Sequence, residues 1–188
     1  YWNDEGQYIV RNITDDTETE FYDYDGELPL TYRDGLFWGV SASGKAEIYA
    51  PYGSLKFKCG QKDYNTENLL LSGYSPSIIY KVNDRYCFST INSENGKFEN
   101  TTEIKEDSYL KNAQIYYSGD EKYLFYVQVN GYILGYDIEE KKHKPIVDLA
   151  DINNDSALLG IKNTTDGTYL FVTENKIYRL IEKSGDST

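Results

Sequence analysis

Residues 123–137 read Tyr-Leu-Phe-Tyr-Val-Gln-Val-Asn-Gly-Tyr-Ile-Leu-Gly-Tyr-Asp, and they carry the strongest structural signal in the chain. Two runs rich in aromatic and β-branched residues flank the pair Asn130-Gly131. Asn-Gly supplies the positive φ angles that a tight hairpin turn requires. The stretch therefore predicts a β-hairpin with strands at Lys122–Val129 and Tyr132–Ile138.

The same pattern returns about 46 residues further along the chain, a spacing typical of propellers and other repeat arrays. There, the strand Thr168–Thr173 is followed by a turn at Glu174-Asn175 and a second strand at Lys176–Ile181. Gly35–Gly39 and Arg85–Ser89 hold the equivalent place in two earlier copies. We therefore expect repeated structural units along most of the chain.

Each unit gains further short strands on either side of this hairpin. The strands expected before it are Leu28–Tyr32, Ser77–Val82, Ala113–Tyr117 and Ala157–Lys162, and those expected after it are Ser54–Lys58, Thr102–Lys105 and Lys144–Leu149. The sequence thus predicts a unit of about four antiparallel strands that is repeated roughly four times. Helical periodicity is weak throughout, so we expect an all-β fold.

The two ends of the sequence complement each other. Gln7–Ile13 and Glu18–Tyr24 resemble the last two strands of a unit, whereas the final unit, residues 157–181, lacks its fourth strand. We predict a small β-propeller of about four blades, or a fragment of one, forming a single domain over residues 1–188. Pairing of the N-terminal strands with the last unit would close the ring and remove the free sheet edges.

Composition excludes several classes of function. The chain has 188 residues, with 19 basic and 31 acidic side chains and a net charge of −12. This balance disfavours nucleic acid, which requires a basic face, and favours a neutral or cationic partner. An aromatic content of 15% is too high for a disordered acidic tail. No apolar run is long enough to cross a membrane.

The segment Tyr116–Val127, together with Asn130–Asp137, resembles the blades of TolB-like and related bacterial WD-like propellers. Those blades carry a turn rich in serine and aspartate before an apolar strand, followed by a strand ending in a Tyr-x-x-Asp-like sequence. The Trp-Asp and Gly-His signatures of eukaryotic WD repeats are missing. The resemblance implies an extracytoplasmic propeller used for binding, and it brings no catalytic residues.

The sequence contains no Met, so we expect that Tyr1 is not the natural first residue. A removed signal or lipid-bearing anchor is consistent with this start, and the composition favours a bacterial source. We therefore expect an extracytoplasmic protein, secreted or at the cell surface. Cys59 and Cys87 allow one disulfide, but two buried, reduced thiols are the commoner arrangement in strands.

No catalytic or metal-binding constellation stands out, and we expect no cofactor. The only histidine, His143, has lysines on both sides, and we interpret it as part of a solvated turn before Pro145. Asp151, Asn153 and Asp155 place oxygen ligands at alternate positions, as calcium loops do. The Gly and Glu of the helix-loop-helix version are missing, which favours a plain linker.

Tyrosine is the one unusual feature, with 20 residues. Its flat ring and polar tip suit both half-buried strand positions and binding surfaces. The aromatic residues that we predict to contact a ligand lie close to turns: Tyr24, Trp38, Tyr52, Tyr74 and Tyr117. Structural packing is the competing explanation for each of them.

The acidic run Asp15–Glu20 is interpreted as a solvated edge strand and turn. We therefore expect a non-enzymatic recognition or scaffold module that binds a protein or glycan through its loops. Two alternatives stay open. One is a carbohydrate-active or peptidase-associated propeller with a carboxylate site. The other is a purely structural domain of a larger cell-surface protein.

Overall fold

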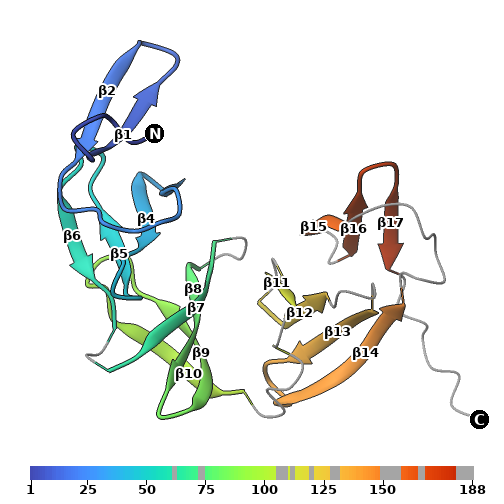
Figure 1. Ribbon diagram of the computed structural model, residues 1–188. Coiled ribbons are helices and arrows are strands. Elements are labelled where there is room, and N and C mark those ends of the chain that lie inside the picture. The colour runs from blue at the N-terminus through green and yellow to red at the C-terminus, as the bar shows by residue number, and fades with distance from the viewer. Residues whose placement is uncertain are drawn as a thin grey trace, which may run out of the picture. The chain divides into compact units, whose positions relative to one another are not determined.

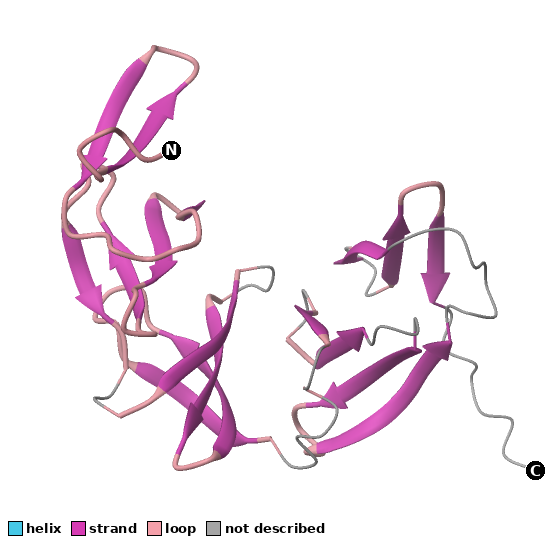
Figure 2. Cartoon of the chain, viewed as in Figure 1, coloured by secondary structure: helices cyan, strands magenta, loops and turns pink. Residues whose placement is uncertain are grey.

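The computed structural model describes residues 1–60, 63–71, 75–104, 110, 113–118, 121–127, 132–148, 158–164 and 168–180. These residues form strands, turns and loops, and none of them lies in a helix (Figure 2). Accordingly, the described part of the chain contains no helix that could span a membrane. The chain divides into two compact units: one comprises Tyr1–Leu71 and Ser75–Glu103, and the other comprises Ser72–Tyr74 and Ile104–Thr188.

The first unit contains a hairpin and two sheets (Figure 1). The hairpin is β1 (Tyr8–Asn12) with β2 (Thr17–Phe21). The first sheet has the order β3 (Thr31–Arg33), β4 (Leu36–Val40), β5 (Ala46–Tyr49) and β6 (Leu55–Lys58). The second has the order β7 (Asn65–Leu70), β8 (Ser77–Val82), β9 (Arg85–Ile91) and β10 (Phe98–Glu103).

The second unit contains two sheets of the same kind. One is β11 (Gln114–Tyr117), β12 (Tyr123–Val127), β13 (Tyr132–Asp137) and β14 (Lys142–Asp148). The other is β15 (Leu158–Asn163), β16 (Tyr169–Thr173) and β17 (Ile177–Leu180). Both repeated hairpins of the sequence are thereby confirmed, and the last sheet has three strands among the described residues, as expected.

Every sheet is an antiparallel meander in which consecutive strands are neighbours. A meander of four short strands is the blade of a β-propeller, so the all-β propeller-type fold predicted from the repeats is confirmed. In the described strands, β1 and β2 pair with each other. Closure of a ring by pairing of this hairpin with the last sheet stays a prediction, as does the single domain over residues 1–188.

Apolar side chains between successive sheets form the cores. In the first unit, Trp38 and Ile48 of the first sheet pack in one cluster with Ile78 and Tyr80 of the second. In the second unit, Phe125 and Ile133 of the β11–β14 sheet cluster with Ile161, Tyr169 and Phe171 of the last. A single meander shields neither of its faces by itself, and stacking against the next sheet buries them.

In the second sheet, β8 lies one place later than the sequence predicted. We expected Ser77–Val82 to be the first strand of this unit, but β8 occupies the second place because β7 precedes it in the sheet. The sequence of β7, Asn-Thr-Glu-Asn-Leu-Leu, begins with polar residues, and its register shifts between Thr66 and Asn68. Only Leu70 of the strand is buried, and its first four residues are polar, so the apolar alternation that marks the other strands is missing.

The two cysteines are free and buried, and both belong to the core cluster between the first two sheets. This confirms the expectation of buried, reduced thiols, although only Cys87 lies in a strand, β9, and Cys59 directly follows β6. Burial raises the pKa of Cys59 to about 12, with a smaller contribution from the negative charge of Glu47. Burial also raises the pKa of Cys87. Neither thiol is therefore a reactive nucleophile.

Candidate binding site

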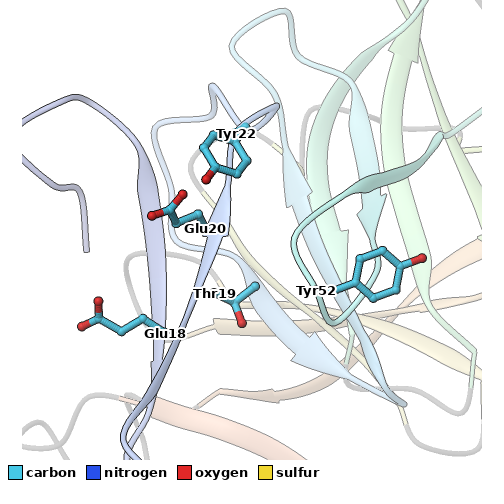
Figure 3. Close-up of a pocket in the computed structure, with 5 residues that line it drawn as sticks. All are labelled: Glu18, Thr19, Glu20, Tyr22 and Tyr52. Carbon is cyan, nitrogen blue, oxygen red and sulfur yellow. The ribbon is translucent and has the colours of Figure 1, made fainter.

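A surface pocket of about 450 Å³ lies where the N-terminal hairpin meets the turn between β5 and β6. The residues that line it are Glu18, Thr19, Glu20, Tyr22 and Tyr52, all of the first unit (Figure 3). The pocket is shallow and open to solvent. Two carboxylates and two phenol rings thus share one concave surface.

Alternation along β2 explains why these side chains face outward. Phe21 is completely buried, and the strand period of two residues places Glu18 and Glu20 on the opposite face. In Figure 3 both glutamates project from one side of β2 and Thr19 projects from the other, toward the neighbouring turn. Tyr22 follows directly after the strand and is 71% exposed.

An aromatic cluster fixes the hairpin against the first sheet. Tyr8 and Phe21 of the hairpin pack with Tyr24 and with Tyr49 of β5. The ring of Phe21 lies 5.8 Å from that of Tyr49, and the ring of Tyr8 lies 5.3 Å from that of Tyr24, both in edge-to-face geometry. This packing holds β2, which forms one wall of the pocket, in place against the first sheet.

The turn between β5 and β6 forms the other wall. Backbone hydrogen bonds shape it, from Ala50 N to the oxygen of Ser54 (2.9 Å) and from Gly53 N to the oxygen of Ala50 (3.0 Å). Gly53 has a φ of +89°, and a Cβ added there would lie 1.9 Å from the carbonyl oxygen of Glu20. Only glycine permits this approach of the turn to β2, and the turn presents Tyr52, which is 77% exposed.

The pocket is acidic. Glu18 Oε1 accepts a hydrogen bond of 2.8 Å from the hydroxyl of Tyr1, and this bond raises the pKa of Tyr1. Arg11 is the cross-strand neighbour of Glu18, but its guanidinium bonds to Asp16. Among the described residues, no ion pair involves Glu18 or Glu20.

Of the five aromatic residues predicted as ligand contacts, the structure describes four. Tyr24, Trp38 and Tyr117 are buried, with exposed fractions of 3%, 1% and 3%. Packing, the competing explanation, accounts for these three side chains, and none of them presents a ring to solvent. Tyr52 lines the pocket, and its role as a contact stays a prediction. Tyr74 lies outside the described residues.

Two further sequence interpretations fall in the second unit. His143 was expected in a solvated turn, but it lies half-buried in β14, opposite Tyr136. Its ring is 5.1 Å from that of Tyr126 and 4.9 Å from that of Tyr136. Strand alternation corrects the expectation, because the adjacent Lys144 points to the other face and pairs with Asp137 at 2.9 Å.

The suggested calcium ligands, Asp151, Asn153 and Asp155, lie outside the described residues. Within the part of the chain that the structure describes, no group of three or more His, Cys, Asp or Glu side chains could hold a metal ion.

Sequence reasoning missed Glu18, Glu20 and Tyr22. The acidic run was interpreted as a solvated edge, which its exposure supports. One signal could have identified the site: an alternate-residue pattern of Glu, Glu and Tyr places three side chains on one strand face. The contribution of the β5–β6 turn carries no such local signal.

No family model matches the sequence, and no curated protein matches it. Solved structures similar to this chain include the WD40 β-propeller domain of Doa1, with 14% identity and a TM-score of 0.41, over 76% of this chain and 45% of that one. Hsv2 of Kluyveromyces lactis matches with 10% identity and a TM-score of 0.46, over 94% and 68% of the two chains.

The extracellular domain of a hybrid two-component system of B. thetaiotaomicron matches with 15% identity and a TM-score of 0.45. That match covers 98% of this chain and 27% of the other, so the chain spans only part of that domain and of the Doa1 domain. The meander topology itself defines the class, an all-β repeat protein of the β-propeller type.

Proposed function

We propose that this protein is a non-enzymatic binding module that recognises a protein or glycan partner, and that the pocket between β2 and the β5–β6 turn is its contact site. The observation that carries the proposal is an open pocket lined by two exposed rings, Tyr22 and Tyr52, and by two glutamates, on a framework anchored by a packed aromatic core. Tyrosine is enriched at binding surfaces because its rigid ring provides large contact area with a polar tip.

The shape of the pocket favours binding over catalysis. A glycosidase encloses the scissile bond between two carboxylic acids and excludes bulk water. Here Glu18 is exposed and the pocket is open, so nothing shields a reacting group from solvent. We accordingly propose no reaction at this site.

We further propose an extracytoplasmic location and membership of the TolB-like group of bacterial propellers. Both proposals are supported by the blade-like sequence Tyr116–Val127 and by its strand pairing in β11 and β12. Fractionation of the source cells tests the location: recovery of the full-length protein in the cytoplasmic fraction alone would refute it.

Arrays of glycans and peptides test the binding function. The wild type is compared with Tyr52→Ala, which removes a ring of the pocket, and with Tyr32→Ala, which removes an exposed tyrosine outside it. We expect a partner that binds the wild type and Tyr32→Ala equally and binds Tyr52→Ala at least severalfold more weakly. Failure to bind any array member, or binding that is indifferent to Tyr52→Ala, contradicts the proposal.

A further inference from the structure

We propose that the pocket at β2 takes the cationic side chain of an arginine or lysine from a basic segment of a partner protein. This inference rests on the proposed binding function and specifies its ligand. It is carried by three features of the described residues: the charge of the pocket, its aromatic walls and the obstructed edge of β2.

The charge comes from two carboxylates that point the same way. Glu18 and Glu20 project from one face of β2 (Figure 3), about 7 Å apart along the strand, given a rise of roughly 3.4 Å per residue. The nearest cation in the hairpin register, Arg11, is engaged by Asp16. Glu18 accepts the hydroxyl hydrogen bond of Tyr1, but among the described residues neither carboxylate has a cationic partner. A planar guanidinium matches carboxylate geometry.

The aromatic walls suit the same ligand. Tyr22 and Tyr52 are among the most exposed tyrosines in the described chain, at 71% and 77%. The face of a phenol ring attracts a cation, and guanidinium groups also stack on aromatic rings. Tyr22 lies on the side of β2 from which Glu18 and Glu20 project, whereas Tyr52 lies on the side of Thr19 (Figure 3). The carboxylates and the Tyr22 ring can therefore bind one arginine or lysine side chain through two different interactions. A neutral sugar would use the rings but not the negative charge.

The edge of β2 decides the mode of binding. Ile9 accepts a hydrogen bond from the backbone nitrogen of Tyr1 (3.0 Å) and donates one to the Tyr1 oxygen (2.8 Å), so its backbone groups point away from β2. Its register partner Glu20 must therefore direct its own N–H and C=O to the free edge of β2. Gly53 lies against that carbonyl, so the turn obstructs the addition of a strand at Glu20. Capture of a side chain, rather than addition of a strand, is the mode that remains.

The same charge disfavours two other occupants. A second copy of this chain that bound through the same surface would place its own Glu18 and Glu20 against the pocket, and like charges in contact repel. The chain as a whole carries a net charge of −12, which repels anionic partners such as nucleic acids and acidic membrane surfaces. A basic protein segment is the macromolecule that both the pocket and the overall charge attract.

The test uses short Gly/Ser peptides that contain one central arginine, lysine or citrulline, titrated into the protein by calorimetry or fluorescence. Citrulline retains the shape of arginine and removes its charge. The pocket variant is Glu18→Gln/Glu20→Gln. The control variant, Glu67→Gln/Glu94→Gln, removes the same charge from exposed positions elsewhere in the first unit.

We expect the arginine peptide to bind the wild type and the control variant alike, and to bind the pocket variant about fivefold more weakly. Added salt weakens the binding, and citrulline abolishes it. Equal binding of the citrulline peptide, or an equal loss in both double variants, overturns the inference. A neutral glycan that binds at Tyr52 while no basic peptide binds would refute the cationic ligand and leave the proposed function standing.

Discussion

Replacement of Gly53 by alanine tests how the pocket is built. Gly53 has a φ of +89°, which L-residues adopt only with strain. The added Cβ would also lie 1.9 Å from the Glu20 carbonyl oxygen and 3.3 Å from Cγ2 of Thr19. The first contact is with backbone and is far below van der Waals separation, so either the turn or β2 must move. We expect the pocket to widen and the hairpin to loosen.

Gly35 offers a matched control. It lies in the β3–β4 turn with a φ of +78°, and an added Cβ would meet no atom within 4 Å. Gly35→Ala therefore introduces only the strain of an L-residue at positive φ, at a cost of about 1–2 kcal/mol. Gly53→Ala adds an overpacking cost of about 1–3 kcal/mol. We predict that Gly53→Ala lowers the free energy of unfolding of the first unit by about 2–5 kcal/mol.

Urea denaturation followed by tyrosine and tryptophan fluorescence measures both variants. The midpoint should fall further for Gly53→Ala than for Gly35→Ala, with similar slopes, because the difference arises in the folded state. Equal losses in the two variants would show that the turn does not contact β2 as described. The pocket would then lack its second wall.

Three further predictions concern the core and its titrating groups. Trp38→Ala should lower the free energy of unfolding by about 3–5 kcal/mol because the side chain is buried. Tyr52→Ala, at an exposed position, should change it by less than about 0.5 kcal/mol. Urea melts that showed the reverse order would place Trp38 at the surface. Cys59 and Cys87 should react with a thiol reagent only after denaturation, since burial raises both thiol pKa values; rapid labelling of the native protein would contradict this. Burial raises the pKa of Tyr24 to about 12, above its unfolded value of about 10. The neutral phenol therefore stabilises the fold below pH 10, and this contribution to the free energy of unfolding is lost as the pH rises from about 10 to 12. A free energy of unfolding that stays flat across this range in urea melts would refute the shift.

The hairpins were predictable because local chemistry and tertiary role agree in them. In β12 and β16 the sequences Tyr-Leu-Phe-Tyr-Val and Tyr-Leu-Phe-Val-Thr combine high strand propensity with burial between two sheets. Their repetition at a fixed spacing indicated the propeller-type fold before any contact was known. Strand pairing then followed from the short turns between neighbours.

The strands that escaped prediction have weak local signals. β7 opens with the polar run Asn-Thr-Glu-Asn, so its place in the sheet comes from pairing with β8 and not from its own pattern. Similarly, β3 is limited to Thr31–Arg33, although the sequence favoured a start at Leu28. Pro29 has no backbone N–H to donate to a strand partner, which is consistent with the later start.

The candidate site was only partly predictable, because tyrosine gives the same local signal in two environments. Tyr24 and Tyr52 both lie beside turns, yet Tyr24 is buried and donates its hydroxyl hydrogen bond to the Leu28 carbonyl, whereas Tyr52 is exposed. A buried tyrosine is tolerated where its hydroxyl finds such an acceptor, and sequence alone does not reveal that acceptor. The meeting of β2 with the β5–β6 turn depends on Gly53, whose close contact is likewise non-local.

Mapping of amide chemical shifts during titration with the arginine peptide tests the central claim most directly. The account predicts that the largest changes fall on residues 18–22 of the hairpin and on residues 50–54 of the neighbouring turn, with small changes in the sheet β7–β10 and in the second unit. Largest changes at residues outside these two segments would contradict the assignment of the binding site.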